Sequence, residues 1–171
     1  MPAPPNGFEP KRTALLVMDF QNGIVGRLAD PDPLVTRVRD VIADVRAHGG
    51  VIGFVRVAFT DEDYATVPAT NITFAAAAEN RTMGDDDAST AIIDALAPQR
   101  GDIVVRKVRV GAMSTTDLDQ RLRARGVNTV VLTGISTSGV VLSTVMDAAD
   151  RDYRVYVLSD GVADSDPELH D

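Results

Sequence analysis

The sequence contains no cysteine, only two histidines and no apolar run long enough to cross a membrane. Without cysteine no side chain can supply a thiolate, so thiol-dependent covalent catalysis is excluded. A membrane-spanning helix needs about 18 consecutive apolar residues. Residues 1–7 lack the basic stretch and apolar core of a signal peptide, and residues 1–12 are expected to form a flexible N-terminal arm. The sequence therefore predicts a cytoplasmic protein without a membrane partner.

Positive charge is also scarce, with 17 basic against 25 acidic residues and a formal net charge of −8. The basic residues are scattered along the chain, which argues against a nucleic-acid partner. Only two of the 17 basic residues, Lys11 and Lys107, are lysines, so the chain strongly prefers arginine. A lysine that occurs against this preference invites a chemical explanation. The length of 171 residues fits one domain, expected over 13–171.

Short apolar strands alternate with amphipathic helices along the chain, which is typical of an α/β fold with a parallel sheet and helices on both faces. Asp32 is expected to cap the first long helix, and Ser114 with Asp117 to start a later one. The expected strands are 14–18, 51–57, 103–105, 129–133 and 154–158, and the expected helices are 33–48, 90–96, 114–125 and 137–151.

Residues 58–87 form a long irregular stretch rich in Asp, Thr, Ala and Asn. It is too long for a simple connector in a compact domain, so we expect a lid or a subunit contact. The alanine-rich segment 75–78 either packs at such a contact or forms a short surface helix. At the other end, segment 166–171 is typical of the start of a further helix, which predicts that the chain has been shortened or has a longer tail.

Residues 134–144 have the pattern of a nucleophile-bearing turn, because a strand runs into Gly134, small polar residues and then a helix. The carboxyl ends of parallel strands form the crevice that binds small molecules. Asp19, Lys107 and this turn each follow a strand and are expected to meet there. Desolvation raises the pKa of a carboxyl and a neighbouring ammonium lowers it, so Asp19 and Lys107 can form a proton-transfer pair. Taken singly, each also fits a structural role, Asp19 in a turn and Lys107 in solvent.

Three blocks, residues 15–22, 107–113 and 133–144, resemble the signatures of the isochorismatase-like hydrolases over nearly the whole chain. This superfamily includes isochorismatases, nicotinamidases and N-carbamoylsarcosine amidohydrolases, and the resemblance implies a three-layer α/β/α sandwich with a mostly parallel sheet. Amidases of the superfamily use an aspartate, a lysine and a cysteine. The resemblance carries the first two onto Asp19 and Lys107, while the place of the cysteine falls on Val140. Valine has no nucleophilic atom, so amide hydrolysis through a thioester is not expected.

Isochorismatases of this superfamily work without the cysteine, which implies a role for Asp19 as a general acid. It would protonate the enol ether carbon of a vinyl ether, and water would attack the resulting oxocarbenium and release pyruvate. Lys107 would hold the acid and help to bind an anionic substrate. Arg109 either pairs with a substrate carboxylate or is a solvated or interface charge. The resemblance also implies a cis Ile135–Ser136 peptide that aims backbone amides into the pocket. The predicted substrate-binding residues are Gln21, Phe59, Arg109, Ile135, Ser136 and Gly139.

Two other functions stay open. One is a non-catalytic relative that binds a ligand or serves in an assembly. The other is an amidase in which activated water or Ser136, Ser138 or Ser143 replaces the thiol, although no histidine lies near them in the sequence. Thr137 or Ser138 has the simpler role of capping the following helix.

Cofactors and partners follow from the same resemblance. Nicotinamidases hold a divalent metal through an aspartate and histidines after the second strand. Asp61, Glu62 and Asp63 occupy that region without a histidine partner, so we expect neither a metal nor a cofactor. The expected partners are a small-molecule substrate and copies of the chain itself, in a homodimer or homotetramer.

Overall fold

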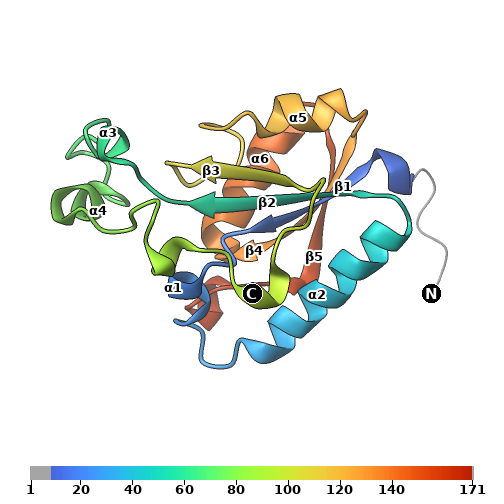
Figure 1. Ribbon diagram of the computed structural model, residues 1–171, viewed down its shortest axis with the longest axis horizontal. Coiled ribbons are helices and arrows are strands. Elements are labelled where there is room, and N and C mark those ends of the chain that lie inside the picture. Colours follow the sequence, from blue (N-terminus) through green and yellow to red (C-terminus); the bar gives the residue numbers. More distant parts are fainter. Residues whose placement is uncertain (1–8, 171) are drawn as a thin grey trace.

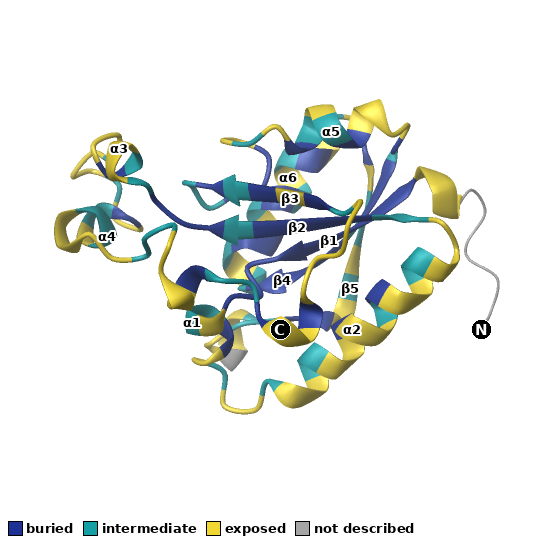
Figure 2. Cartoon of the chain, viewed as in Figure 1, coloured by how far each residue is buried: buried dark blue, intermediate teal, exposed yellow. Residues whose placement is uncertain are grey.

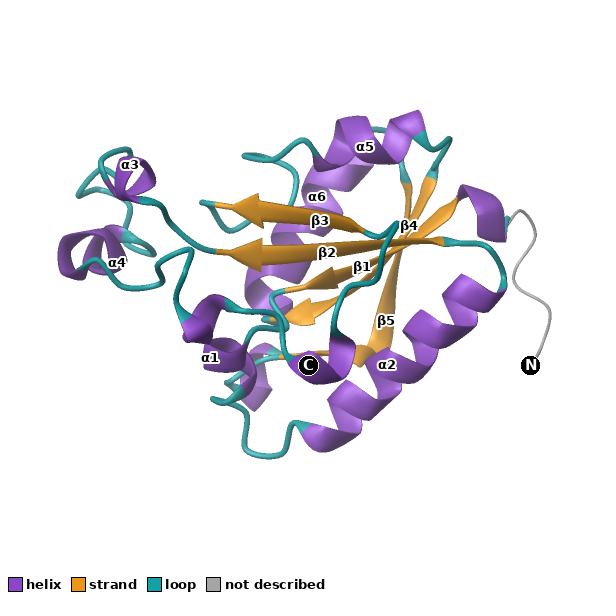
Figure 3. Ribbon diagram, viewed as in Figure 1, coloured by secondary structure: helices purple, strands orange, loops and turns teal. Residues whose placement is uncertain are grey.

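The computed structural model describes residues 9–170 and has at its centre a sheet of five strands, all parallel (Figure 3). Most of the expected N-terminal arm lies outside the described residues, and its last part, Pro10–Arg12, forms a 3-10 turn. The strand order is β3-β2-β1-β4-β5. The strands are β1 (Thr13–Met18), β2 (Val51–Val57), β3 (Ile103–Lys107), β4 (Thr129–Ile135) and β5 (Arg154–Ala163).

Helices cover both faces of the sheet (Figure 1). The long helix α2 (Asp32–Ala47) lies on one side with the short helix α1 (Asn22–Val25), and α5 (Leu118–Ala124) and α6 (Leu142–Asp150) lie on the other. This arrangement confirms the predicted α/β class and its three-layer sandwich.

The two faces of the sheet bury two separate hydrophobic clusters. Leu15 and Val17 of β1 point to the side where Val38 and Ile42 of α2 pack. Leu16 and Met18 point the other way, into a cluster that includes residues of α5 and α6. All six residues of β1 are buried (Figure 2). Burial of each leucine, valine or methionine side chain contributes roughly 1.5–3 kcal/mol, so β1 firmly supports the residue that follows it.

Several expected boundaries move for identifiable reasons. The helix expected at 90–96 is wrong, because residues 88–96 form two 3-10 turns, Ala88–Thr90 and Asp94–Leu96, around an extended bridge from Ile92 to Gln21. The start expected at Ser114 is wrong too: α5 begins at Leu118, whose N–H donates to the Thr116 hydroxyl.

Other ends shift less. Asp32 is the first residue of α2 and does not cap it with its side chain. Strand β5 runs five residues past the expected end, to Ala163, because it shifts register beside Gly134 and pairs again with the end of β4. The expected helix 137–151 divides into a π-helical turn, Thr137–Val141, and α6.

The irregular segment between β2 and β3 carries two short helices, α3 (Asp61–Tyr64) and α4 (Ala75–Asn80), which project from the carboxyl end of the sheet (Figure 1). Its alanine-rich part is the short helix that the sequence offered as one alternative. Phe59, Tyr64 and Phe74 form a small core of their own, with Phe59 stacked on Tyr64 at 5.5 Å and edge-on to Phe74 at 5.5 Å. We refer to residues 58–90 as the insertion.

Within residues 9–170, no helix combines the length and the apolarity that crossing a bilayer requires.

Candidate active site

Asp19 follows the buried strand β1 directly and is itself buried. Its backbone adopts φ 62°, the left-handed region that non-glycine residues rarely occupy. Its N–H donates to the Val55 carbonyl at 2.8 Å, and its own carbonyl accepts from the Gln21 N–H at 2.8 Å. These bonds turn the chain sharply at the strand end, so the carboxylate stays at the rim of the sheet. Unusual backbone conformations of this kind concentrate at functional sites.

Lys107, the last residue of β3, is only 2% exposed and forms an ion pair with Asp19. Its Nζ lies 2.9 Å from Asp19 Oδ2. The same ammonium donates to the Val110 carbonyl at 2.9 Å and to the Arg109 carbonyl at 3.3 Å. A buried ammonium needs such partners for all its protons, and here the three acceptors hold Nζ at one place beside the carboxylate.

The other carboxylate oxygen, Asp19 Oδ1, has no hydrogen-bond partner, and among the described residues it is the one buried side-chain nitrogen or oxygen in this condition. Burial raises the pKa of Asp19 from 3.8 to about 6, against the charge and hydrogen bond of Lys107, which lower it. An acid with this pKa is present in both protonation states near neutral pH. The arrangement can therefore donate or accept a proton at Oδ1 while Oδ2 stays anchored.

The turn after β4 lies beside this pair in the sheet, because Gly134 is in register with Met18 on β1. The peptide Ile135–Ser136 is cis, as the resemblance implied. Val140 lies in the π-helical turn, is 2% exposed and belongs to the hydrophobic cluster under α5 and α6. At Gly139 an added Cβ would come within 2.6 Å of Ser136 Oγ, so the turn is closed tightly at this point.

Two hydroxyl groups of the turn have partners elsewhere in the chain. Ser138 donates its N–H and its Oγ to Asp164 Oδ2, at 3.0 and 2.7 Å. Thr137 Oγ1 lies 2.9 Å from His170 Nδ1. The expectation that Thr137 or Ser138 caps the helix is wrong, because Ser136 is the N-cap residue and no side chain caps this end.

Two other predicted site residues serve the backbone around the pair. Gln21 is 1% exposed, and its amide donates to the carbonyls of Val57 and Thr90 at 2.9 and 2.8 Å and accepts from the Val57 N–H at 2.8 Å. Phe59 is also 1% exposed, in the aromatic core of the insertion. Both lie where the insertion leaves and rejoins the sheet, and their contact with a substrate remains a prediction.

Arg109 is half-buried and donates to the Thr66 carbonyl at 3.0 Å and to the Val108 carbonyl at 2.6 Å. These bonds tie the loop after β3 to the insertion. The structure therefore favours an intramolecular contact for its guanidinium, an alternative that the sequence did not suggest.

Of the acidic residues after β2, Asp63 pairs with Arg106 and forms a capping box with Thr60, the N-cap residue of α3. Asp61 pairs with Arg81. In the part of the chain that the structure describes, no group of three potential ligand side chains is placed to hold a metal ion. The absence of a metal stays a prediction.

A family model described as the isochorismatase domain matches residues 13–171. The chain belongs to the isochorismatase family of hydrolases. The isochorismatase family protein YwoC of Bacillus subtilis strain 168 is 34% identical over 161 residues, which cover 94% of this chain and 82% of that protein.

Two further relatives of this isochorismatase-family chain carry named activities. Ureidoacrylate amidohydrolase RutB of Methylobacterium radiotolerans is 32% identical over 189 residues, covering 97% of this chain and 73% of that protein. The crystal structure of N-carbamoylsarcosine amidase from Thermoplasma acidophilum superimposes with a TM-score of 0.77 at 33% identity, covering 92% of this chain and 88% of that one.

Sequence reasoning missed three features of this isochorismatase-family site. These are the contact of Thr137 with His170, the contact of Ser138 with Asp164, and the charged cluster of Arg56, Asp85 and Arg106. The residues in these contacts lie 21 to 50 positions apart in the sequence, and no local pattern marks such distant pairs. The one signal in the sequence is an arginine within or directly after an apolar strand pattern, Arg56 within 51–57 and Arg106 after 103–105.

Proposed function

We propose that this chain hydrolyses a small anionic molecule with Asp19 as its general acid–base and without a covalent enzyme intermediate. The observation that carries the proposal is that Asp19 Oδ1 is buried and has no hydrogen-bond partner, while Lys107 Nζ lies 2.9 Å from the other carboxylate oxygen, Oδ2. In the sequence the cysteine position of the related amidases falls on Val140, and the chain has no cysteine at all. Water is then the nucleophile.

A vinyl ether would be hydrolysed in three steps. Protonated Asp19 gives its proton to the terminal enol carbon, forming a C–H bond and an oxocarbenium. Water adds to the ether-bearing carbon of the oxocarbenium and forms a hemiketal. The hemiketal breaks its bond to the alcohol oxygen, which takes the remaining hydroxyl proton and leaves as the alcohol, and pyruvate remains. The proton lost by water returns to the Asp19 carboxylate. Lys107 holds Oδ2 throughout and adds positive charge that favours an anionic substrate.

The test is a screen of the purified protein against pyruvyl vinyl ethers, ureido acids and simple amides, with Asp19→Asn as the matched variant. We expect wild-type turnover of one class and a loss of about 10²–10⁴-fold in Asp19→Asn, the range that general acid–base groups contribute. Equal turnover by the two proteins would overturn the proposal. Ligand binding by both, with turnover by neither, would favour the non-catalytic relative.

The pH profile separates acid from base catalysis. Vinyl ether cleavage needs protonated Asp19, so kcat should fall as pH rises through about 6, the pKa to which burial raises this carboxyl. Hydrolysis that uses the carboxylate as a base would instead gain rate over the same interval. A profile that is flat between about pH 5 and about pH 7 would remove Asp19 from the chemical step.

A second candidate function, an amidase with a substitute nucleophile, is favoured by the Thr137 Oγ1 contact with His170 Nδ1 at 2.9 Å. Two relatives are named for N-carbamoyl or ureido substrates. In this scheme Thr137 Oγ bonds to the carbonyl carbon, its proton passes through His170 to the leaving nitrogen, and water then cleaves the ester. Loss of ureido-acid turnover in Thr137→Val, with retention in Ser138→Ala, would support it.

The expected assembly into a homodimer or homotetramer also remains a proposal. It is supported by the projecting insertion, where Ile72 is 95% exposed. Large exposed apolar side chains at such a position are found at subunit contacts as well as on ordinary surfaces. The molar mass in solution, by light scattering, tests it directly, and a monomer at all concentrations would contradict it.

A further inference from the structure

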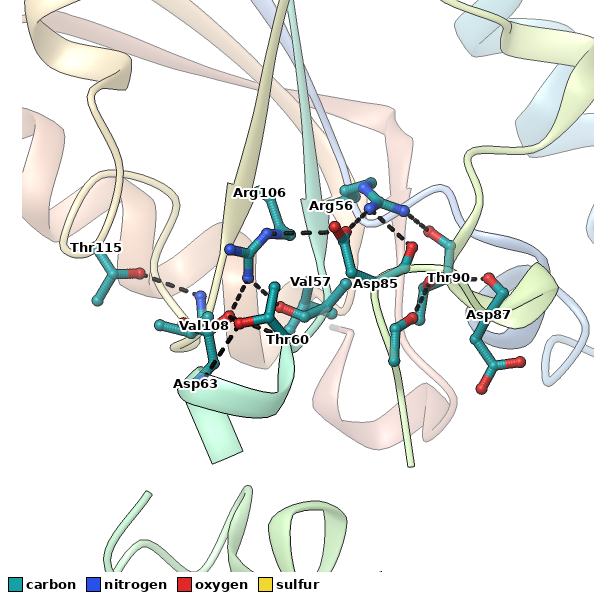
Figure 4. Close-up of polar contacts among 12 residues, drawn as sticks. Arg56, Val57, Thr60, Asp63, Asp85, Asp87, Thr90, Arg106, Val108 and Thr115 are labelled. Carbon is teal, nitrogen blue, oxygen red and sulfur yellow. Dashed lines mark hydrogen bonds and ion pairs between the residues drawn. The ribbon is translucent and has the colours of Figure 1, made fainter. Parts of the chain in front are cut away.

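Two arginines face each other across neighbouring strands near the candidate site. Arg56 of β2 is in register with Arg106 of β3, and their side chains are 20% and 31% exposed. Like charges directly opposite on adjacent strands destabilise a sheet. Figure 4 shows the carboxylate of Asp85 between the two guanidinium groups. Asp85 Oδ1 pairs with Arg56, and Arg106 Nε lies 3.7 Å from the same oxygen.

Asp85 also contacts Phe59, one of the residues predicted to bind the substrate. Its backbone N–H donates to the Phe59 carbonyl at 2.9 Å, while its own carbonyl accepts from Arg56 Nη2 at 3.1 Å. One residue therefore joins Phe59, through the backbone, to both arginines of the sheet. Phe59 packs in the aromatic core that touches Val110, whose carbonyl accepts from Lys107.

The two arginines bind both limbs of the insertion. Arg106 Nη1 donates to the Ala58 carbonyl at 2.9 Å and to Asp63 Oδ2 at 2.5 Å on the outgoing limb (Figure 4). Arg56 Nη1 donates to the Thr90 carbonyl at 3.1 Å on the returning limb. That carbonyl also accepts from Gln21, two residues after Asp19. The charged cluster thus connects the insertion to the strand ends that carry the site.

We propose that Asp85 is a positioning residue, which through Arg56 and Arg106 holds Phe59 and the insertion against the site and so sets substrate affinity. The inference rests on the proposed function and on the prediction that Phe59 contacts the substrate. Asp85 touches none of the reacting atoms, so it acts on the binding of ground state and transition state alike. Loss of such uniform binding raises KM and leaves kcat nearly unchanged.

The experiment compares Asp85→Asn with Asp86→Asn. Asparagine keeps the shape of the side chain and removes the charge that separates the two arginines. Asp86 is the neighbouring exposed carboxylate, and the described part of the structure gives it no ion pair and no side-chain hydrogen bond. We expect KM to rise about tenfold in Asp85→Asn with kcat within about threefold of wild type, and no change in either constant in Asp86→Asn. The pH profile of kcat should keep its midpoint, because Asp19 is untouched.

Equal KM values for the two variants, or a loss of kcat at constant KM, would overturn the inference. If Asp85→Asn fails to fold, Arg106→Gln serves in its place. It removes the guanidinium that donates to Ala58 and Asp63, so KM should again rise with kcat nearly unchanged, and an unchanged KM would overturn the inference.

Failure of the proposed function is recognised separately, because wild type itself then turns over no substrate. In that case hydrogen exchange decides the inference. Faster exchange at residues 58–64 in Asp85→Asn than in Asp86→Asn supports the positioning role, and unchanged exchange refutes it.

Discussion

At the scale of single residues, Asp19 carries a carboxylate at a buried position where charge is disfavoured, and Lys107 offsets only part of the free-energy cost of burying that charge. The pair is buried at the carboxyl edge of the sheet, with one oxygen anchored at 2.9 Å from the ammonium and the other without a partner. A structural ion pair is stabilised best when every polar atom is satisfied. An unsatisfied oxygen next to a satisfied one does not add to stability, and it is the arrangement that the proposed proton transfer needs.

The raised pKa of Asp19 makes a prediction about stability. The folded-state pKa of about 6 exceeds the unfolded value of 3.8, so the native state binds the proton more tightly than the unfolded chain. Its contribution to the free energy of unfolding is full below pH 4 and is lost as pH rises through about 6. The difference amounts to about 3 kcal/mol.

The measurement is urea unfolding of wild type and Asp19→Asn between pH 4 and 6.5. Asparagine does not titrate, so wild type should lose stability relative to the variant across this interval. A constant difference between the two proteins would contradict a raised pKa in the folded state.

Val140 gives a second prediction at this scale. The resemblance of the turn to the family signature places the thiol of related amidases at this residue, which is 2% exposed. Cysteine and valine have similar volumes, so Val140→Cys should cost less than about 1.5 kcal/mol. Because the chain has no other cysteine, the variant carries a single thiol. We expect it to gain turnover of ureido acids or amides, or to retain an acyl adduct detectable by mass spectrometry.

Val141→Cys is the matched control, since Val141 is also 2% exposed and lies one position further along the same turn. Its thiol points elsewhere and should stay inert. The same outcome for both variants, active or inactive, would show that residue 140 does not hold the family's nucleophile position.

At the scale of elements, the parts that periodicity determines were predictable and the parts that depend on distant contacts were not. The bounds of β2 agree with the structure, because its apolar run is bounded by Gly50 on one side and a polar segment on the other. Asp19 and Lys107 could be brought together from the rule that parallel strands end at the same edge. Their roles, and those of the other site residues, rest on the resemblance and remain predictions.

Where the sequence pattern did not determine the structure, the cause is in several places a partner far along the chain. Residues 88–96 have helix-forming composition, but Ile92 bridges to Gln21 and stays extended. Strand β5 continues to Ala163 because a register shift lets it pair with Ile135. The insertion folds around Phe59, Tyr64 and Phe74, which are brought together by packing and not by a sequence period. Tertiary contacts override local propensity at all three places.

At the scale of the whole molecule, the sheet and the insertion differ in the size of their cores. The sheet is covered on both faces by large clusters, whereas the insertion has a small one whose buried members are Val57, Phe59, Tyr64 and Phe74. Figure 2 shows α3 and α4 largely exposed or intermediate beside a buried sheet. Opening free energies follow buried apolar contacts, so the insertion should open without unfolding the sheet.

Hydrogen exchange under low guanidinium concentrations tests this difference. Amides of β1, such as Leu16, should exchange only with global unfolding and respond strongly to denaturant. Amides of the insertion, such as Thr66 and Ala78, should exchange through local openings that respond weakly. If both sets of amides exchanged with the same free energy of opening, the molecule would unfold as a single cooperative unit. Because Asp19 and Lys107 are fixed by strands and only Phe59 belongs to the insertion, local opening would admit a substrate while the acid and the ammonium stay paired.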